Sequence, residues 1–109
     1  MYEPSRLVST FHIAGFQHHD GALVLGKLKP GKKLKMAAEH DNPYDPDAVA
    51  LLYKGTMLGY VPRAENGLIA QLMRFGHKGV FEARVMQVDP EADPWNQVRV
   101  GVYVVDKRG

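Results

Sequence analysis

The stretch from Glu39 to Pro62 constrains the fold most strongly, because a polar loop with two prolines leads into two apolar segments. Pro43 and Pro46 fix their own φ at about −65° and disfavour the helical conformation at the residue before each. The loop is therefore stiff, and ordering it around a ligand costs little conformational entropy.

Three side chains of this loop are candidates for contact with a ligand. Asn42 and Asp45 stand directly before the prolines, where short polar side chains bond to nearby backbone and hold a turn. A rigid loop of this kind presents Asn42, Tyr44 and Asp45 to a binding partner. The alternative is that the loop is a well-ordered connector between two strands.

The composition is that of a globular domain. With 109 residues, 45% of them hydrophobic and 24% charged, we expect residues 1–109 to form a single domain around one core. No cysteine is present, which excludes disulfides and thiolate metal sites. The first residues have no signal-peptide pattern and no apolar run reaches membrane length, so we expect a soluble, cytoplasmic protein without membrane contact.

The net charge of +2 is too small to indicate a partner, but the charges are distributed unevenly. A cluster of cations lies within the segment 27–35, namely Lys27, Lys29, Lys32, Lys33 and Lys35. The segment 39–47 holds acids and contains no lysine or arginine. The lysine cluster predicts a surface that attracts phosphate beside a loop that repels it. The alternative is a solvated strand or turn.

Hydrophobic patterns predict a mostly β domain with one clear helix. Strands are predicted over Leu7–Phe16, Lys33–Glu39, Ala48–Tyr53, Met57–Val61, Val80–Val88 and Gln97–Val105. The segment Ala22–Leu28 fits a short helix and a strand equally well. An apolar stripe followed by Gly76 predicts a helix over Ala64–Phe75 that ends in a left-handed cap. Several short strands with a helix inserted late indicate a small, bent antiparallel fold.

Local chemistry predicts two of the turns. Pro30 followed by Gly31 is the residue order of a type II turn. The sequence Lys54-Gly55-Thr56 is short enough for a hairpin, which would join the third and fourth predicted strands.

The sequence contains no convincing pattern for catalysis. Ser5 and Ser9 are the only serines, neither lies in a Gly-x-Ser-x-Gly elbow, and cysteine is absent. The segment Gly26–Lys33 is close to a P-loop but lacks the Ser or Thr that would hold Mg²⁺. We therefore expect a protein that is not an enzyme and that needs no cofactor.

Histidines and acids near two turns form a candidate metal site. His18 and His19 with the neighbouring Asp20 are residue types that bind Zn²⁺ or Fe²⁺. Adjacent side chains of an extended chain point in opposite directions, which disfavours His18 and His19 as joint ligands. A metal-dependent function through these histidines and the acidic loop stays as one alternative.

Aromatic and cationic residues fit a surface for single-stranded DNA, which needs faces for base stacking beside cations for the phosphates. The candidate stacking faces are Tyr44, Tyr60, Trp95, His18 and His19. The candidate cations are Arg63 and the lysine cluster, with Lys33 and Lys35 among the expected contacts. Tyr60 and Trp95 also fit places in the core or at a barrel mouth, because both lie beside apolar strands.

Two motifs together resemble a known family. The segment Asp41–Ala50 reads Asp-Asn-Pro-Tyr-Asp-Pro-Asp-Ala-Val-Ala, and Leu58–Arg63 reads Leu-Gly-Tyr-Val-Pro-Arg. At this spacing they resemble the core motifs of HIRAN domains, and the resemblance extends from about Phe11 to Val104. It implies an SH3- or OB-like barrel, here with six bent antiparallel strands and one or two helices.

The resemblance also implies a site. Some HIRAN domains bind the 3′-OH end of single-stranded DNA in a pocket whose floor is the Asn-Pro-Tyr-Asp loop. Here Tyr44 would stack on the terminal base, Asp45 would accept a hydrogen bond from the 3′-hydroxyl, and Asn42 would bond to base or sugar.

One part of that implied site differs in this chain. In DNA-binding members, the turn after the first strand supplies a basic residue and two aromatics, and a late aromatic also lines the pocket. The corresponding turn reads Gln17, His18 and His19, so the fixed positive charge is missing. Imidazoles can stack, but they carry charge only below a pH of about 6.5 unless their pKa is shifted. Trp95 matches the late aromatic.

The expected function is a non-catalytic module that captures 3′ ends of single-stranded DNA in DNA repair or replication-fork processing. Its partners would be single-stranded DNA and DNA-processing proteins. The first alternative is an SH3-like module, in which exposed aromatics beside the acids Asp41, Asp45 and Asp47 grip a basic or proline-containing peptide. The second is the metal-binding domain described above.

Overall fold

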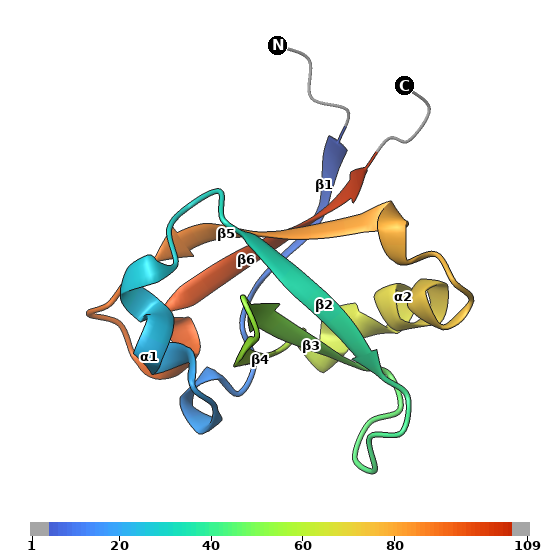
Figure 1. The fold of residues 1–109 in the computed structure, drawn as a ribbon, viewed down its shortest axis with the longest axis horizontal. Helices are drawn as coiled ribbons and strands as arrows, with labels where there is room; N and C mark the ends of the chain where they lie inside the picture. The colour runs from blue at the N-terminus through green and yellow to red at the C-terminus, as the bar shows by residue number, and fades with distance from the viewer. Residues whose placement is uncertain (1–4, 106–109) are drawn as a thin grey trace.

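The computed structural model describes residues 5–105, with the side chains of residues 5 and 78 left aside. Over this range, six strands form one antiparallel sheet in the order β1-β6-β5-β2-β3-β4 (Figure 1). The strands are β1 (Ser5–His12), β2 (Lys33–Glu39), β3 (Ala48–Tyr53), β4 (Thr56–Tyr60), β5 (Phe81–Val88) and β6 (Val98–Val105). The α-helices are α1 (Gly21–Val24) and α2 (Arg63–Arg74). The 3-10 turns are η1 (Phe16–His18), η2 (Leu25–Lys27), η3 (Lys78–Val80) and η4 (Pro94–Asn96).

The sheet closes on itself just after β1. The N–H of Ala14 donates to the carbonyl of Tyr60 at 2.9 Å, and the N–H of Tyr60 donates to the carbonyl of Ala14 at 2.9 Å. This bridge, which we call the seam, joins the chain after β1 to the end of β4. The two strands at the ends of the sheet order are thereby connected, and the sheet becomes a small barrel.

Gly59 permits the close approach of the two chains at the seam. Its φ is +152°, a conformation that side-chain-bearing residues rarely adopt. A Cβ at this position would lie 2.6 Å from Cγ2 of Ile13 and still closer to the carbonyl oxygen of Ala14. Barrel closure therefore requires a glycine at this position of the Leu-Gly-Tyr-Val-Pro-Arg motif for steric reasons.

The core lies inside the barrel. Strand positions that alternate along β6 face inward and are almost completely buried, namely Val98, Val100 and Val102. Helix α2 packs against β2 and β3 and contributes Ile69, Ala70 and Met73 to the core. Helix α1 packs against β4, and the two helices lie on opposite sides of the barrel in Figure 1.

The predicted elements are largely confirmed. Strands β2 and β3 have the predicted bounds, and α2 begins and ends one residue before the predicted helix. Gly76 has a φ of +90° and its N–H donates to the carbonyl of Met73, while the N–H of His77 donates to the carbonyl of Leu72 at 2.8 Å. This is the Schellman pattern of a left-handed C-terminal cap, as predicted.

Both predicted turns are also confirmed. The N–H of Lys32 donates to the carbonyl of Lys29 at 3.0 Å, and Gly31 has a φ of +93°, as a type II turn requires. Lys54 and Gly55 both have positive φ, which is the type I′ geometry that links β3 to β4.

Two expectations need refinement. The strand predicted over Leu7–Phe16 is wrong at its end, because β1 stops at His12 and Gly15 turns the chain with a φ of +72°. Of the two alternatives for Ala22–Leu28, the helical one is observed, as the end of α1 and the turn η2. Within the part of the chain that the structure describes, no helix has the length and apolar character needed to cross a membrane.

Candidate nucleic-acid interface

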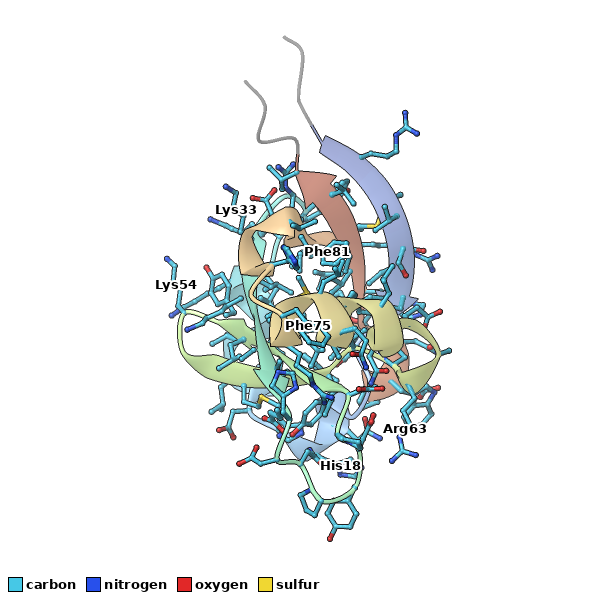
Figure 2. All side chains as sticks on the ribbon, turned by 90° about the vertical axis from the view of Figure 1, so that its right-hand side faces the viewer. His18, Lys33, Lys54, Arg63, Phe75 and Phe81 are labelled. Carbon is cyan, nitrogen blue, oxygen red and sulfur yellow. The ribbon has the colours of Figure 1, made fainter. Side chains whose placement is uncertain are left out.

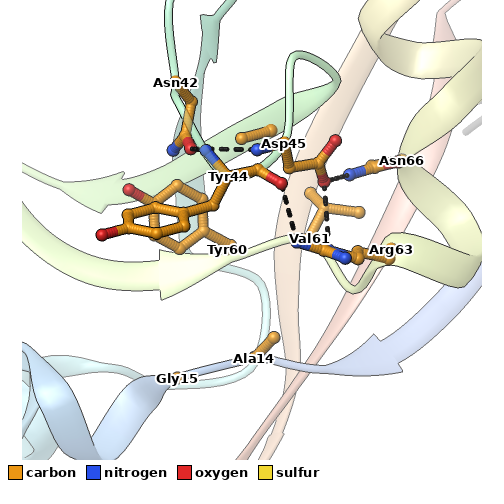
Figure 3. Close-up of a pocket in the computed structure, with 10 residues that line it drawn as sticks. Ala14, Gly15, Asn42, Tyr44, Asp45, Tyr60, Val61, Arg63 and Asn66 are labelled. Atoms are coloured by element: carbon orange, nitrogen blue, oxygen red, sulfur yellow. Dashed lines mark hydrogen bonds and ion pairs between the residues drawn. The ribbon is translucent and has the colours of Figure 1, made fainter.

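A pocket of about 340 Å³ opens at the seam, between the loop that follows β2 and the turn that follows β1 (Figure 3). Three chain segments meet there: the seam itself, the loop 40–47 and the start of α2. The lining residues are Ala14, Gly15, Asn42, Tyr44, Asp45, Ala48, Tyr60, Val61, Arg63 and Asn66. Barrel closure therefore brings the two sequence motifs of this chain to one site.

Asn42 organises the loop that forms one wall of this pocket. Its Oδ1 accepts hydrogen bonds from the N–H of Tyr44 at 2.9 Å and from the N–H of Asp45 at 3.1 Å. Its Nδ2 donates to Oε1 of Glu39 at 3.1 Å. Both acceptor positions of the Asn42 amide are thus used inside the loop, and one further N–H can be offered to a ligand.

Asp45 fastens the loop to α2. Its Oδ1 accepts from the N–H of Asp47 at 2.9 Å, and its Oδ2 accepts from Nδ2 of the buried Asn66 at 2.9 Å. The Nε of Arg63 lies 3.6 Å from the same Oδ2. Hydrogen bonding from Asp47 and then from Asn66 lowers the pKa of Asp45, against an opposing effect of burial and with a further contribution from Arg63. Asp45 therefore presents an ionised carboxylate, which still has acceptor capacity for a hydroxyl.

The lowered pKa of Asp45 predicts a pH dependence of stability. Its stabilising contribution is complete above the ordinary pKa of 3.8 and is lost as the pH falls through the lower folded value. We expect the free energy of unfolding to fall more steeply below about pH 5 in the native protein than in Asp45→Asn, which cannot titrate there. Urea unfolding at several pH values measures this difference. An equal slope in the native protein and in Asp45→Asn would contradict the role of Asp45.

Arg63 supplies the cation of the pocket. It is the first residue of α2, its NH2 donates to the carbonyl of Tyr44 at 2.9 Å, and its side chain is 74% exposed. The guanidinium thus supports the loop backbone and still has donors directed to solvent. Arg63 and Tyr44 both line the pocket, and a cation together with an aromatic ring is a combination that suits a nucleotide.

Tyr60 forms the base of the pocket. Its hydroxyl donates to Oε1 of Glu39 at 2.9 Å, and its ring makes an edge contact with His19, with 5.8 Å between ring centroids. Burial raises the pKa of Tyr60, and its hydrogen bond to Glu39 raises the pKa further. Tyr60 is therefore a half-buried residue at the barrel mouth, one of the two placements expected for it, and Glu39 holds both Tyr60 and Asn42.

The turn after β1 contributes less than the resemblance implied. His19 reaches Tyr60, but Gln17 and His18 are exposed on η1 and do not line the pocket. Trp95 is 53% exposed on η4, which packs against η1, so it also lies outside the pocket lining. Gln17, His18 and Trp95 are exposed, and the lining of the pocket includes none of them.

Lys33 is not beside the loop, whereas Lys35 lines a groove together with His40, the first residue of the loop. Both lie at the start of β2, and Nζ of Lys33 is 3.1 Å from Oε1 of Glu82 on β5. The strand carries Lys33 roughly 20 Å from Glu39 at about 3.3 Å per residue. Figure 2 shows Lys33 at the opposite end of the molecule from His18. The expected phosphate-attracting surface next to the loop is therefore wrong for Lys33, because β2 is extended.

Several residues of the site were missed by the sequence analysis. Asn66 is 4% exposed and lies on the buried face of α2, at helical spacing from Ile69, Ala70 and Met73. A polar residue in an apolar helix stripe was the signal that could have identified it. The contribution of Ala14 and Gly15 depends on barrel closure, which no local pattern in the sequence indicates.

The histidines and acids do not form a metal site. Among residues 5–105, no group of three or more His, Asp or Glu side chains is arranged so that it could hold a metal ion. The carboxylates of Asp45 and Asp47 are instead engaged by Asn66, Arg63 and Arg74. The structure therefore gives no support to the metal-binding alternative.

The fold and the site together define the class of protein, which is a closed β domain with a polar and aromatic pocket at its seam. The HIRAN domain model matches residues 7–105, and the chain belongs to the HIRAN domain family. HIRAN domains are in general DNA-binding modules. No curated protein matches the chain.

Solved structures share this fold. A protein from Lactobacillus plantarum has a TM-score of 0.76 and 21% sequence identity, over 96% of this chain and 99% of that chain. The HIRAN domain of human HLTF has a TM-score of 0.61 and 17% identity, over 94% of this chain and 82% of that chain. The expected mostly β architecture, with six bent antiparallel strands and two short helices, is confirmed.

Proposed function

We propose that this protein is a non-catalytic module that binds the 3′-OH end of single-stranded DNA in the seam pocket. The observation that carries the proposal is the arrangement of three groups around one pocket: the exposed ring of Tyr44, the ionised carboxylate of Asp45 and the exposed guanidinium of Arg63. Each group matches one part of a terminal nucleotide, namely base, hydroxyl and phosphate.

The dimensions of the pocket support a single terminal nucleotide as the ligand. Its volume of about 340 Å³ lies at the lower end of the range for small-ligand sites. Stacking contributes roughly 1–3 kcal/mol per base, so one or two stacks with a few phosphate contacts would give a micromolar complex. Arg63 would supply the positive charge that Gln17 lacks.

Asp45 would select the chemical form of the end. A carboxylate accepts a hydrogen bond from a 3′-hydroxyl, whereas a 3′-phosphate would bring like charges together in a partly shielded pocket. We expect a short labelled oligonucleotide with a free 3′-OH to bind about tenfold more tightly than its 3′-phosphate form, equivalent to about 1.4 kcal/mol. Fluorescence anisotropy at low salt measures both affinities.

A 5′-phosphate form of the same oligonucleotide is the control, because it adds the same charge at the other end and should bind like the unmodified strand. Equal affinity for the 3′-OH and 3′-phosphate forms would contradict end recognition. Absence of binding to every form at low salt would contradict nucleic-acid binding altogether.

We propose that this activity serves DNA repair or replication-fork processing in the cytoplasm, with DNA-processing proteins as partners. One HIRAN domain over residues 1–109 would carry it.

The SH3-like alternative has weaker support. It needs free acids for a basic peptide, but Asp45 lies beside Arg63, and Asp47 lies 4.0 Å from Arg74. The proposed absence of catalysis rests on the lack of a nucleophile in a suitable motif.

A further inference from the structure

One side of β2 has an open edge. The strand pairs with β3 from Lys35 to Glu39, but with β5 only at Lys33 and Leu34. After Leu34 the two strands diverge, and within the described sheet no other strand takes up the edge of β2 that faced β5. The end of α2 lies next to this edge.

The ladder on either side of β2 indicates which backbone groups face the open edge. The N–H of Val85 on β5 donates to the carbonyl of Lys32 at 2.9 Å, so backbone groups at even positions of β2 point toward β5. On the other side, the N–H of Val61 donates to the carbonyl of Val49, so the backbone groups at odd positions of β3 point away from β2. The even positions of β3 therefore bond with β2, and the register pairs them with the odd positions of β2. The N–H and C=O groups of Met36 and Ala38 therefore face the open edge.

A groove runs along this edge. It has a volume of about 530 Å³, with Met36 and Ala38 on one wall and Met73 and Gly76 at the end of α2 on the other. Lys35, Met36 and Met73 also line a second hollow of about 350 Å³ that continues to Phe81. Phe75 is 73% exposed and lies on the same face of the molecule as Phe81 (Figure 2).

The charges around the groove are predominantly positive. Lys35 and Arg74 line it, and the acid of the adjoining hollow, Glu82, is paired with Lys33. Arg74 is also 4.0 Å from Asp47 and its side chain is 40% exposed, whereas Lys35 is exposed. An acidic ligand is therefore favoured.

We propose that this edge of β2 docks an extended acidic segment of a protein partner, which adds a short strand beside Met36 and Ala38. A peptide backbone can pair with both the N–H and the C=O groups of the edge, whereas the phosphates of a nucleic acid can only accept. A second copy of the chain would bring Lys35 against its own equivalent, a repulsion that proteins use to block edge-to-edge pairing. Acidic side chains of the docked segment meet Lys35 and Arg74, and apolar ones meet Met36 and Met73.

The test uses a labelled peptide of about eight residues that alternates Glu and Val, with fluorescence anisotropy at low salt and amide chemical shifts of the full chain as readouts. We expect binding to shift the amide signals of Met36 and Ala38 and to weaken about fivefold in Lys35→Glu. Lys29→Glu, the same charge change in the turn before β2, is the matched control and should bind like the native protein. Ala38→Pro removes an edge N–H without touching the β3 ladder, and should abolish binding while the urea midpoint shows that the domain is folded.

The proposal is overturned if the peptide does not bind, or if Lys35→Glu and Lys29→Glu bind it equally. It is also overturned if an oligonucleotide, rather than the peptide, shifts the Met36 and Ala38 amides, or if dilution shifts them because the chain self-associates. If Ala38→Pro fails to fold, the comparison of Lys35→Glu with Lys29→Glu and the amide shifts of Met36 and Ala38 still test the proposal. The groove is separate from the seam pocket, so either binding activity can fail without the other.

Discussion

Replacing Gly59 by alanine is expected to lower the free energy of unfolding by about 3 kcal/mol or more. The new Cβ would lie 2.6 Å from Ile13 and even closer to the carbonyl oxygen of Ala14, at a φ of +152°. Either the two chains at the seam separate or the backbone of Gly59 changes conformation, and both responses break the bridge between Ala14 and Tyr60. Urea unfolding of the variant and the native protein measures the loss.

Gly67→Ala is the matched control for this experiment. Gly67 lies inside α2, and a Cβ there would meet no atom within 4 Å. Because glycine is unfavourable in a helix interior, this substitution should raise the free energy of unfolding by about 0.5–1 kcal/mol. If Gly59→Ala left stability unchanged, the close approach of chains at the seam would not be a requirement of the fold.

The second large effect is expected on binding. Tyr44→Ala should weaken the affinity for a 3′-OH oligonucleotide by roughly 5- to 150-fold, which corresponds to the loss of about 1–3 kcal/mol of stacking. The ring is 85% exposed, so the free energy of unfolding should change by less than about 0.5 kcal/mol. Anisotropy titration and urea unfolding of the same protein preparation separate the two effects.

Tyr44→Phe distinguishes the ring from its hydroxyl. Phenylalanine retains the stacking face, so this variant should bind within about twofold of the native protein. Native affinity in Tyr44→Ala would remove this ring from the proposed site. An equal loss in both variants would instead indicate that the hydroxyl, and not the stacked face, contacts the ligand.

Features that depend on neighbouring residues could be predicted from the sequence. The bounds of β2 and β3 are sharp because prolines, glycines and a polar loop surround them. The cap at Gly76 and the turn at Gly31 follow from the positive φ that those positions require. The exposure of Tyr44 follows in the same way, because Asn42 and the two prolines shape the loop locally.

Features that depend on distant pairing could not be predicted in this way. The seam joins residues 14 and 60, which carry no pattern that reveals their contact. The lysine cluster is adjacent to the loop in sequence, but an extended strand places Lys33 at the far end of the barrel. The cation of the pocket is Arg63, which the sequence analysis named among the candidate cations, but its place beside the loop depends on the packing of α2.

The seam is one of the short junctions of the barrel. Two hydrogen bonds hold it, whereas β5 and β6 pair along most of their length, so local opening between Ala14 and Tyr60 should cost less free energy than separation of β5 from β6. A nucleotide in the pocket would touch residues on both lips of that junction and would therefore oppose its opening. Ligand binding and closure of the barrel are thus thermodynamically coupled. A substitution that destabilises either chain of the seam should therefore reduce the affinity for the ligand, even if it changes no residue that contacts the ligand.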